Sequence, residues 1–356
     1  MSQFDVVIVG GGIAGASLGA EIAATRRTLI IEAEEHCGMH STGRSAAFWL
    51  ESYGGPQVAK LTAASRAFLA ANGYLTQRGA VHVSDDGWPE LPPGVDARIL
   101  SREELERLVP GIRPRWSRGL LEPGCADIDV AALHTHFLAQ FRRAGGTIAT
   151  RARLRAATFR IGQWTIALDD ESKVHAALLV NAAGAWADSV ASHCGVAPLG
   201  IAPKRRTMVQ LRVGQAGLKQ LPLVDDAAGT FYFKGESDSS VWLSPHDEIA
   251  TEPCDAAPEE IDIATAIARF EQVVDWPVER VERSWAGLRS FAPDRLPVYG
   301  FAAGEPRFFW CAGQGGFGIQ TAPAAAKLAA ALLLEQPPET MIAHIDPANF
   351  APARFS

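Results

Sequence analysis

Four short apolar runs, each followed by a turn rich in glycine or by an acidic residue, mark the framework of this chain. They occupy residues 6–9, 28–31, 176–180 and 308–312. Runs this apolar are typical of strands that are covered on both faces, as in a parallel sheet. The Ala/Leu-rich stretch 322–334 is shorter than the roughly 20 residues of a membrane span, so it predicts a buried helix and no integral membrane segment.

The middle of the chain has a different pattern. Polar and apolar residues alternate at 207–213, 230–234 and 241–244, and a helical pattern covers 258–274. Alternation of this kind predicts strands of an antiparallel sheet with one face in contact with a core. The sequence therefore predicts an α/β fold, in which a Rossmann-like domain carries an inserted α+β domain built on an antiparallel sheet.

The change of pattern along the chain predicts two discontinuous domains. The Rossmann-like, cofactor-binding domain is expected to comprise residues 1–71, 127–185 and 305–356, and the substrate-binding domain residues 72–126 and 186–304. A chain of 356 residues is long enough for two such cores.

Composition narrows the class of protein. The apolar content of 47% and charged content of 21% are typical of a folded domain. The formal net charge of −7 argues against a nucleic-acid partner. The five cysteines form no CxxC pair, which disfavours disulfides and zinc and predicts a reducing cytoplasm, with peripheral membrane association left open. His134 and His136 are two residues apart in a predicted helix and cannot share a ligand, so no metal site is predicted.

The first glycine-rich turn predicts dinucleotide binding. Gly10, Gly12 and Gly15 follow a strand and open a helix, an arrangement that gives a tight turn, close approach to a pyrophosphate and close helix–strand packing. The helix N-terminus offers unpaired N–H groups to phosphates. Glu32 follows Gly12 by about twenty residues, where a carboxylate binds a ribose diol. The alternative is a glycine-rich turn without a ligand.

Five separate motifs together resemble those of the FAD-dependent D-amino-acid oxidase superfamily, which includes glycine oxidase, sarcosine oxidase and the D-amino-acid dehydrogenases. They lie at residues 10–32, 41–45, 180–186, 285–290 and 313–320, in the order of the family and over nearly the whole chain. The resemblance implies an FAD-binding domain of the glutathione-reductase type and FAD as cofactor in place of NAD.

The resemblance is greatest to the bacterial D-arginine dehydrogenases, at residues 40–47 and again at 203–206. It implies non-covalent FAD, because the stretches where relatives tether the flavin, 290–292 and 44–45, contain neither cysteine nor histidine. Cys311 is expected to be a small core residue.

The cofactor residues implied by the resemblance lie in or beside these motifs. They are Gly10, Gly12, Ile13, Ala14, Gly15, Glu32, Ala33, Ser41, Thr42, Arg44, Ser45, Ala46, Ala183, Gly184, Trp186, Gly313, Gly315, Gly316, Phe317, Gly318, Ile319 and Gln320. The helix after Gly318 would direct its positive end at the flavin edge that gains negative charge on reduction. Two simpler alternatives stay open, a plain helix start at Gly318 and a surface charge at Arg44.

Four residues are expected to act on the substrate. Arg289 and Arg206 align with carboxylate-binding arginines of the family, and a planar guanidinium binds a carboxylate through two hydrogen bonds. Tyr232 would donate a hydrogen bond to the same carboxylate, and Tyr53 would close over the substrate. The alternatives are surface ion pairs for the arginines, an exposed polar side chain for Tyr232 and a core position for Tyr53.

The implied reaction is oxidation of an amine alpha to a carboxylate, as in a D-amino acid. Hydride would pass from Cα to flavin N5, and the imino acid would hydrolyse to a 2-oxo acid and ammonia. Dioxygen, a quinone or a carrier protein could accept the electrons. The substrate pocket is expected to include Phe48, Ala80 and Gly315.

Two of these pocket positions differ from the D-arginine dehydrogenases. Phe48 stands in place of a histidine, and Ala80 in place of the glutamate that meets the guanidinium. Without that counter-charge a cationic side chain would be buried unpaired, so apolar side chains are expected to be preferred over D-arginine. The alternatives are a 2-hydroxy-acid dehydrogenase of the same superfamily and a flavoprotein without turnover.

Overall fold

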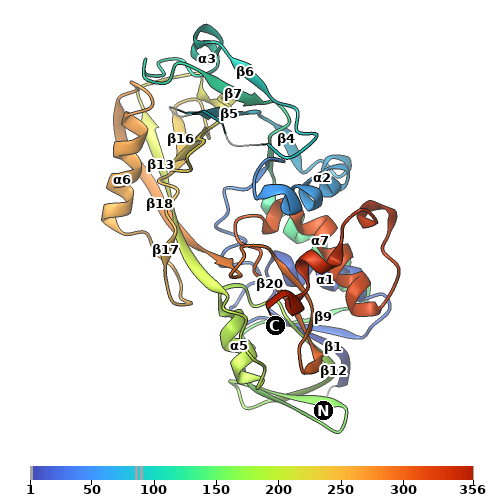
Figure 1. Cartoon of the computed structure of the whole chain (residues 1–356). Coiled ribbons are helices and arrows are strands. Elements are labelled where there is room, and N and C mark those ends of the chain that lie inside the picture. Colours follow the sequence, from blue (N-terminus) through green and yellow to red (C-terminus); the bar gives the residue numbers. More distant parts are fainter. Residues whose placement is uncertain (1–2, 85–86, 89–90, 356) are drawn as a thin grey trace.

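The computed structural model describes residues 3–84, 87–88 and 91–355, and within these residues the strands form three sheets. Figure 1 shows two large bodies, with β1, β12 and α1 in the lower one and β13, β16 and α6 in the upper one. The long strands β13 and β18 run between them. None of the helices in the described part of the chain is long and apolar enough to cross a membrane.

The lower body is built on an eight-stranded sheet with a parallel centre. Its strands, in spatial order, are β10 (Leu154–Arg160), β11 (Gln163–Leu168), β12 (Lys173–Asn181), β1 (Gln3–Val9), β2 (Thr28–Ile31) and β9 (Thr147–Ala149), while β20 (Glu305–Ala312) pairs with β12 and β19 (Val298–Ala302) pairs with β20. The pairs among β9, β2, β1, β12 and β20 are parallel. All four apolar runs are therefore strands of one parallel core, as the sequence predicts.

Helices cover both faces of this sheet. On one face, α1 (Ile13–Ile22) packs between α4 (Val130–Arg143) and α7 (Gly318–Leu334), and α2 (Gly55–Ala71) packs on α7. On the other face lies α5 (Ala187–His193). The Ala/Leu-rich stretch forms most of α7, where small buried side chains allow close packing, so the predicted buried helix is confirmed.

The upper body is a nine-stranded sheet whose paired strands are antiparallel except for β14 and β5. Its order is β17 (Ile249–Ala250), β13 (Ala202–Val213), β16 (Ser240–Ser244), β15 (Tyr232–Gly235), β14 (Leu223–Asp226), β5 (Ala80–Val83), β7 (Gly119–Glu122) and β6 (Arg98–Leu100), with β18 (Val278–Phe291) also paired to β13. α6 (Glu260–Glu271) covers one face, and α3 (Arg102–Leu108) packs beside β6. The predicted antiparallel sheet is confirmed.

Smaller elements complete the fold. A three-stranded sheet joins β3 (Phe48–Trp49), β8 (Ala126–Ile128) and β4 (Leu75–Gln77). Short 3₁₀ turns lie at η1 (Gly184–Trp186), η2 (Leu218–Gln220), η3 (Thr340–Ile342), η4 (Pro347–Phe350) and η5 (Pro352–Phe355). The hairpin of β19 and β20 spans the domain boundary expected at residue 305, and the division into two domains stays a prediction.

Candidate active site

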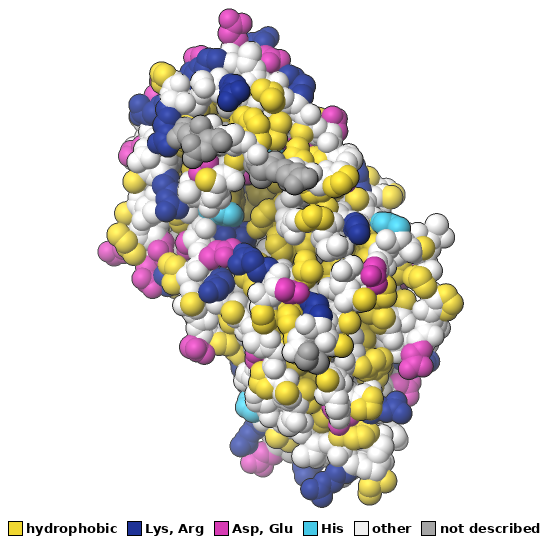
Figure 2. Space-filling view, in the orientation of Figure 1, with side chains coloured by type: hydrophobic (Ala, Val, Ile, Leu, Met, Phe, Trp, Pro, Cys, Tyr) yellow, Lys and Arg dark blue, Asp and Glu magenta, His cyan; other side chains and the backbone are white. Residues whose placement is uncertain are grey.

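A long cavity runs from the carboxyl ends of the parallel strands to the nine-stranded sheet. Its walls come from the glycine turn after β1, the end of β2, residues 38–46, the turn after β12, strands β13, β15 and β18, and the loop before α7. The face of the molecule in Figure 2 is hollowed in its upper half, where hydrophobic side chains surround the depression.

Most of the residues that the sequence predicts for the cofactor and the substrate meet along this cavity. Those that line it are Gly10, Gly12, Ile13, Ala14, Glu32, Ala33, Ser41, Thr42, Arg44, Ser45, Ala46, Ala183, Gly184, Trp186, Arg206, Tyr232, Arg289, Gly315, Gly316, Gly318 and Ile319. Among the described residues, Phe48, Tyr53, Ala80, Gly15, Gly313, Phe317 and Gln320 are not part of this lining.

The turn between β1 and α1 leaves no room for side chains. Gly10 has a φ of +104°, and a Cβ there would lie 2.5 Å from the carbonyl oxygen of Ala182. A Cβ on Gly15 would lie 2.0 Å from the Gly10 carbonyl oxygen. Both positions therefore require glycine, because β1, α1 and the end of β12 converge here.

Polar side chains hold this turn from two sides. Glu32 accepts hydrogen bonds from the backbone N–H of Gly11 at 2.8 Å and of Glu34 at 3.0 Å, at the cavity wall. Thr42 Oγ1 accepts from the N–H of Ile13, the first residue of α1, at 3.0 Å. The turn is thus fixed in shape beside the N-terminus of α1.

His134 of α4 supports the same turn and was not expected there. Its Nε2 lies 2.8 Å from the carbonyl oxygen of Gly11. Burial lowers the pKa of His134, so the neutral imidazole donates its Nε2 proton to this carbonyl. A buried histidine on an apolar helix face carries no sequence signal for this role, since the contact joins residues 123 positions apart.

Arg44 ties the loop 38–46 to the upper body. Its Nη1 donates to the carbonyl oxygens of Ala256 at 2.7 Å and Ala286 at 3.1 Å, and its Nη2 pairs with Asp255. The hydrogen bond from Arg44 lowers the pKa of Asp255. The guanidinium is therefore occupied by the protein itself, while Arg44 still contributes to the cavity wall.

The loop before α7 brings bare backbone close to the charged end of the cavity. Gly315 has a φ of +54°. A Cβ on Gly316 would lie 2.6 Å from the hydroxyl of Tyr53 and 3.0 Å from Cζ of Arg289. Phe317 packs against the Tyr53 ring with centroids 5.0 Å apart. Because Gly316 has no side chain, Arg289 and Tyr53 can approach the loop closely.

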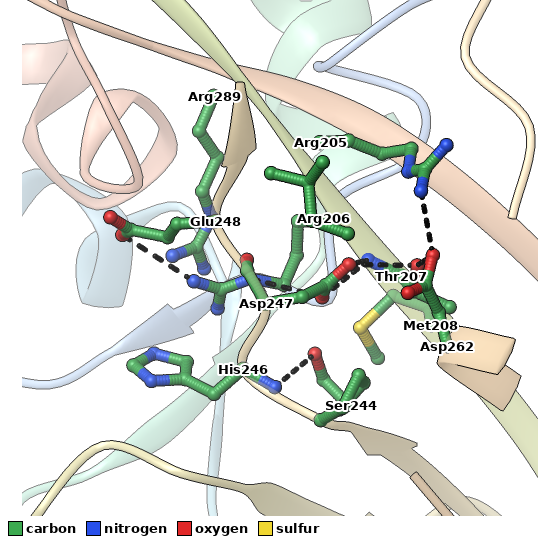
Figure 3. Close-up of polar contacts among 12 residues, drawn as sticks. Arg205, Arg206, Thr207, Met208, Ser244, His246, Asp247, Glu248, Asp262 and Arg289 are labelled. Atoms are coloured by element: carbon green, nitrogen blue, oxygen red, sulfur yellow. Dashed lines mark hydrogen bonds and ion pairs between the residues drawn. The ribbon is translucent and has the colours of Figure 1, made fainter. Parts of the chain in front are cut away.

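Arg206 and Arg289 come from the paired strands β13 and β18. Figure 3 shows their side chains directed toward the same region, with Glu248 and Asp247 nearby. Arg206 is buried, with 4% of its surface exposed. Its Nε donates to the backbone carbonyl of Asp247 at 2.7 Å, but neither of its Nη atoms has a hydrogen-bond partner among the described residues.

Two carboxylates lie near Arg206 but bond other groups more closely: that of Asp247 is 3.7 Å from Arg206 Nε, and that of Glu248 is near Nη2. The Asp247 carboxylate accepts hydrogen bonds from Thr207, and the Glu248 carboxylate lies 3.6 Å from Arg206 Nη2 but pairs more closely with Arg295, at 2.7 Å. Burial and the nearby Arg289 lower the pKa of Arg206. A buried guanidinium with unused N–H donors has the chemistry to bind an anion, and the surroundings of Arg206 and Arg289 are called the anion site below.

Neutral polar groups surround the two arginines. Arg289 Nη1 donates to the Tyr53 hydroxyl at 2.8 Å, and the Tyr232 ring centroid lies 6.0 Å from Cζ of Arg206. The Tyr232 hydroxyl donates to Met208 Sδ at 3.0 Å. Burial, together with the two arginines, lowers the pKa of His246 to about 3, so its imidazole is neutral.

The expected substrate pocket borders this anion site. Phe48 packs edge-on against Tyr232 with ring centroids 6.1 Å apart, and Ala80 is fully buried in the same apolar cluster. Lys234, which the sequence did not point to, places its Nζ 5.4 Å from the Phe48 ring centroid and 3.0 Å from Asp127. It lies two residues from Tyr232 on β15, so both side chains share one face of the sheet.

Gln320 does not face the cavity. Its amide is buried and bonds the loop that carries Tyr53: Oε1 accepts from the N–H of Leu50 at 3.2 Å, and Nε2 donates to the carbonyl of Tyr53 at 3.2 Å and to Thr62 at 2.9 Å. Its direct contacts are therefore with this loop, and its predicted cofactor contact stays untested.

The class of protein follows from comparison with known families. The chain matches the family model of the DAO-type FAD-dependent oxidoreductases over residues 5–332 and belongs to this family. FAD-dependent oxidoreductase domain-containing protein 1 from Bos taurus is 22% identical over 422 residues, covering 99% of this chain and 84% of that protein.

Solved structures agree on the fold. L-proline dehydrogenase from P. horikoshii has a TM-score of 0.82 at 18% identity and covers 98% of each chain. Glycine oxidase from Geobacillus kaustophilus has a TM-score of 0.80 at 20% identity, covering 97% of this chain and 98% of that one.

FAD is the cofactor of this family, and the residues present fit it. The Glu32 carboxylate at the cavity wall suits the ribose. The N-terminus of α1 suits the pyrophosphate, because the turn at Gly10 and Gly15 presents backbone N–H groups without side chains. The loop at Gly315 and Gly316, before α7, suits the ring system beside the two arginines.

Proposed function

We propose that this protein oxidises a D-amino acid, or a related small amine alpha to a carboxylate, to the imino acid, which hydrolyses to a 2-oxo acid and ammonia. One observation carries the proposal. The two Nη atoms of Arg206 are buried and lack hydrogen-bond partners among the described residues, next to Arg289 and at the end of the cavity beside the Gly315–Gly316 loop.

A substrate carboxylate matches these unused donors. Two oxygens can accept the parallel N–H groups of one guanidinium while the second arginine adds positive charge. Burying the carboxylate here also neutralises a charge that is otherwise poorly compensated. The Tyr53 hydroxyl, which already accepts from Arg289, is free to donate its own proton to the same carboxylate.

Orientation is the main contribution assigned to the protein. FAD, when bound, supplies the two-electron acceptor for the amine. With the carboxylate held by Arg206 and Arg289, the adjacent Cα–H has one orientation relative to the Gly315–Gly316 loop, where the ring system fits. His246 is neutral at ordinary pH, so it adds no positive charge beside the two arginines.

The side-chain pocket is proposed to prefer apolar or aromatic groups and to disfavour D-arginine. Tyr232 lines the cavity, and Phe48 and Ala80 belong to the apolar cluster that packs beside it. The Lys234 ammonium lies 5.4 Å from the Phe48 ring centroid and is paired with Asp127, which also pairs with Arg78. A substrate guanidinium placed near Phe48 would therefore find this carboxylate already occupied. We therefore expect the preferred substrate to differ from that of the D-arginine dehydrogenases that the sequence resembles.

A 2-hydroxy acid is the second candidate substrate. Its carboxylate would use the same arginines, and the human mitochondrial L-2-hydroxyglutarate dehydrogenase is 23% identical over 70% of this chain. We also propose that FAD is held non-covalently, that dioxygen, a quinone or a carrier protein reoxidises it, and that the protein works in the cytoplasm. Acid precipitation tests the first of these, since it should release all the flavin into the supernatant.

Anaerobic bleaching of the flavin absorbance tests the proposed reaction. The panel contains both enantiomers of leucine, methionine, phenylalanine, proline and arginine, together with the corresponding 2-hydroxy acids. We expect fastest bleaching by an apolar D-amino acid and slow bleaching by D-arginine. Fastest bleaching by D-arginine would overturn the pocket assignment, bleaching by hydroxy acids alone would select the second candidate, and no bleaching would indicate a flavoprotein without turnover.

A further inference from the structure

The loop that carries Tyr53 is held by a buried acidic residue of the upper body. This loop covers residues 50–54, between β3 and α2. Glu122, at the end of β7, is only 1% exposed. Its Oε1 accepts hydrogen bonds from the backbone N–H of Glu51 at 3.1 Å and of Ser52 at 3.3 Å. Both bonds lie immediately before Tyr53 in the chain.

The carboxylate of Glu122 is itself fixed by an ionic chain across the sheet. Its Oε2 lies 3.4 Å from Nε2 of His82 on β5, and Nδ1 of His82 lies 2.8 Å from Oδ1 of Asp225 on β14. Burial lowers the pKa of His82, but Asp225 and Glu122 outweigh this effect and raise it to about 10. The imidazole is therefore protonated at neutral pH, and each of its nitrogens lies within ion-pair distance of a carboxylate.

The loop needs such an anchor because it is a short turn that ends at two consecutive glycines. Tyr53 N–H bonds the carbonyl of Leu50 at 3.2 Å, and the chain then turns through two consecutive glycines, Gly54 and Gly55, with φ of +108° and +79°. Gln320 holds the loop to α7, whereas Glu122 holds it to the upper body. The position of Tyr53 thus depends on both attachments.

We propose that Glu122 is a positioning residue for the anion site: its carboxylate, fixed by His82, holds residues 51 and 52 and so keeps the Tyr53 hydroxyl against Arg289. Charge-assisted hydrogen bonds to backbone N–H groups are stronger than neutral ones, so a carboxylate suits this task better than an amide. Removal of the side chain releases the loop and separates Tyr53 from Arg289 without touching the cavity. The effect on substrate binding rests on the proposed function, whereas the effect on the loop does not.

Hydrogen exchange measures the loop directly. The FAD-bound protein and its Glu122→Ala and Glu122→Gln variants are compared by mass spectrometry on peptides covering residues 50–54. We expect roughly tenfold faster exchange in Glu122→Ala and a smaller increase in Glu122→Gln, whose amide oxygen can still accept both bonds. Glu282→Gln is the matched control, since this carboxylate bonds Gln210, Arg212 and Ser240 in the same sheet and should leave the loop unchanged.

A second readout connects the loop to the anion site. Anthranilate, an aromatic carboxylate, is titrated against the flavin absorbance, and its Kd is expected to rise about fivefold or more in Glu122→Ala, with partial recovery in Glu122→Gln. Unchanged exchange at residues 50–54 in Glu122→Ala would overturn the proposal. If Glu122→Ala does not fold, His82→Gln replaces it, with faster exchange expected. Absence of anthranilate binding to the unmodified protein would count against the carboxylate site alone, because the exchange result is independent of it.

Discussion

Arg289 Nη1 donates a hydrogen bond to the Tyr53 hydroxyl at 2.8 Å, although the two residues are 236 positions apart in the chain. Arg289 lies on a strand of the upper body, and Tyr53 lies on a loop that is bonded to α7 of the lower body through Gln320. The contact therefore joins the two bodies at the end of the cavity where the carboxylate is proposed to bind. Several consequences of this arrangement can be measured.

Substitution of Arg289 by lysine should weaken substrate binding. A lysine keeps the charge but loses the planar pair of N–H donors and the hydrogen bond to Tyr53. We expect KM to rise about 30-fold or more, equivalent to roughly 2 kcal/mol, with FAD content unchanged. Arg212→Lys is the control, because Arg212 pairs with Glu282 away from the cavity. Equal KM values for the Arg289→Lys variant and the unmodified protein would contradict the assignment.

Loss of the Tyr53 hydroxyl should have a smaller effect. Tyr53→Phe removes one hydrogen bond to Arg289 but keeps the ring packed on Phe317. We expect a cost of about 1 kcal/mol, which corresponds to roughly a fivefold rise in KM in steady-state kinetics. A change confined to kcat, with KM constant, would show that Tyr53 acts after binding and not in it.

The Gly316→Ala substitution should displace the side chains of Arg289 and Tyr53. The added Cβ would lie 2.6 Å from the Tyr53 hydroxyl and 3.0 Å from Cζ of Arg289. We expect kcat/KM to fall about 100-fold, because small displacements of positioning groups are costly. Gly124→Ala is the matched control, since its nearest neighbour would be an ordinary 3.5 Å contact with Trp49. Similar losses in both variants would point to general destabilisation.

The ionic chain at His82 predicts a pH-dependent contribution to stability. The folded-state pKa of about 10 lies above the unfolded value near 6.5, so protonation favours the folded state. This contribution is complete below about pH 6.5 and is lost as the pH rises through about 10. The acidic groups that face His82 or its partner are Asp225, Glu122 and Glu51, and burial together with Glu122 raises the pKa of Glu51.

Thermal unfolding of the His82→Gln variant checks this prediction. The difference in Tm from the unmodified protein should be largest at pH 6 and should shrink toward pH 10. A difference that stays constant over this range would mean that His82 acts through packing alone and that its charge adds nothing to stability.

The parts of the fold and site that sequence could predict are those that leave a pattern in consecutive residues. Gly10 and Gly15 are required by atoms of the same turn and of the strand beside it, and the apolar runs follow from burial on both faces. The strand β18 begins with an alternation of Val, Glu and Arg that gives no clear apolar face, so only its motif at 285–290 carries a sequence signal. Its pairing with β13, which unites Arg206 and Arg289, is a property of the whole sheet.

The residues that sequence reasoning missed depend on contacts between distant strands. Glu122, His82 and Asp225 meet because β7, β5 and β14 are neighbours, and β5 with β14 is the parallel pair of an otherwise antiparallel sheet. Lys234 of β15 likewise contacts Phe48 and Asp127, which lie far from it in the chain. An isolated glutamate, histidine or lysine in the sequence carries no sign of these partners.

Removal of the carboxylate from the substrate, with the protein left intact, tests the central claim most directly. The fastest amino acid of the panel and the amine that lacks only its carboxylate are mixed anaerobically with the enzyme, and flavin bleaching is followed. If Arg206 and Arg289 hold the carboxylate, the amino acid should bleach the flavin at least about 100-fold faster at equal, subsaturating concentration, the equivalent of about 3 kcal/mol. Equal rates for the two compounds would contradict the account.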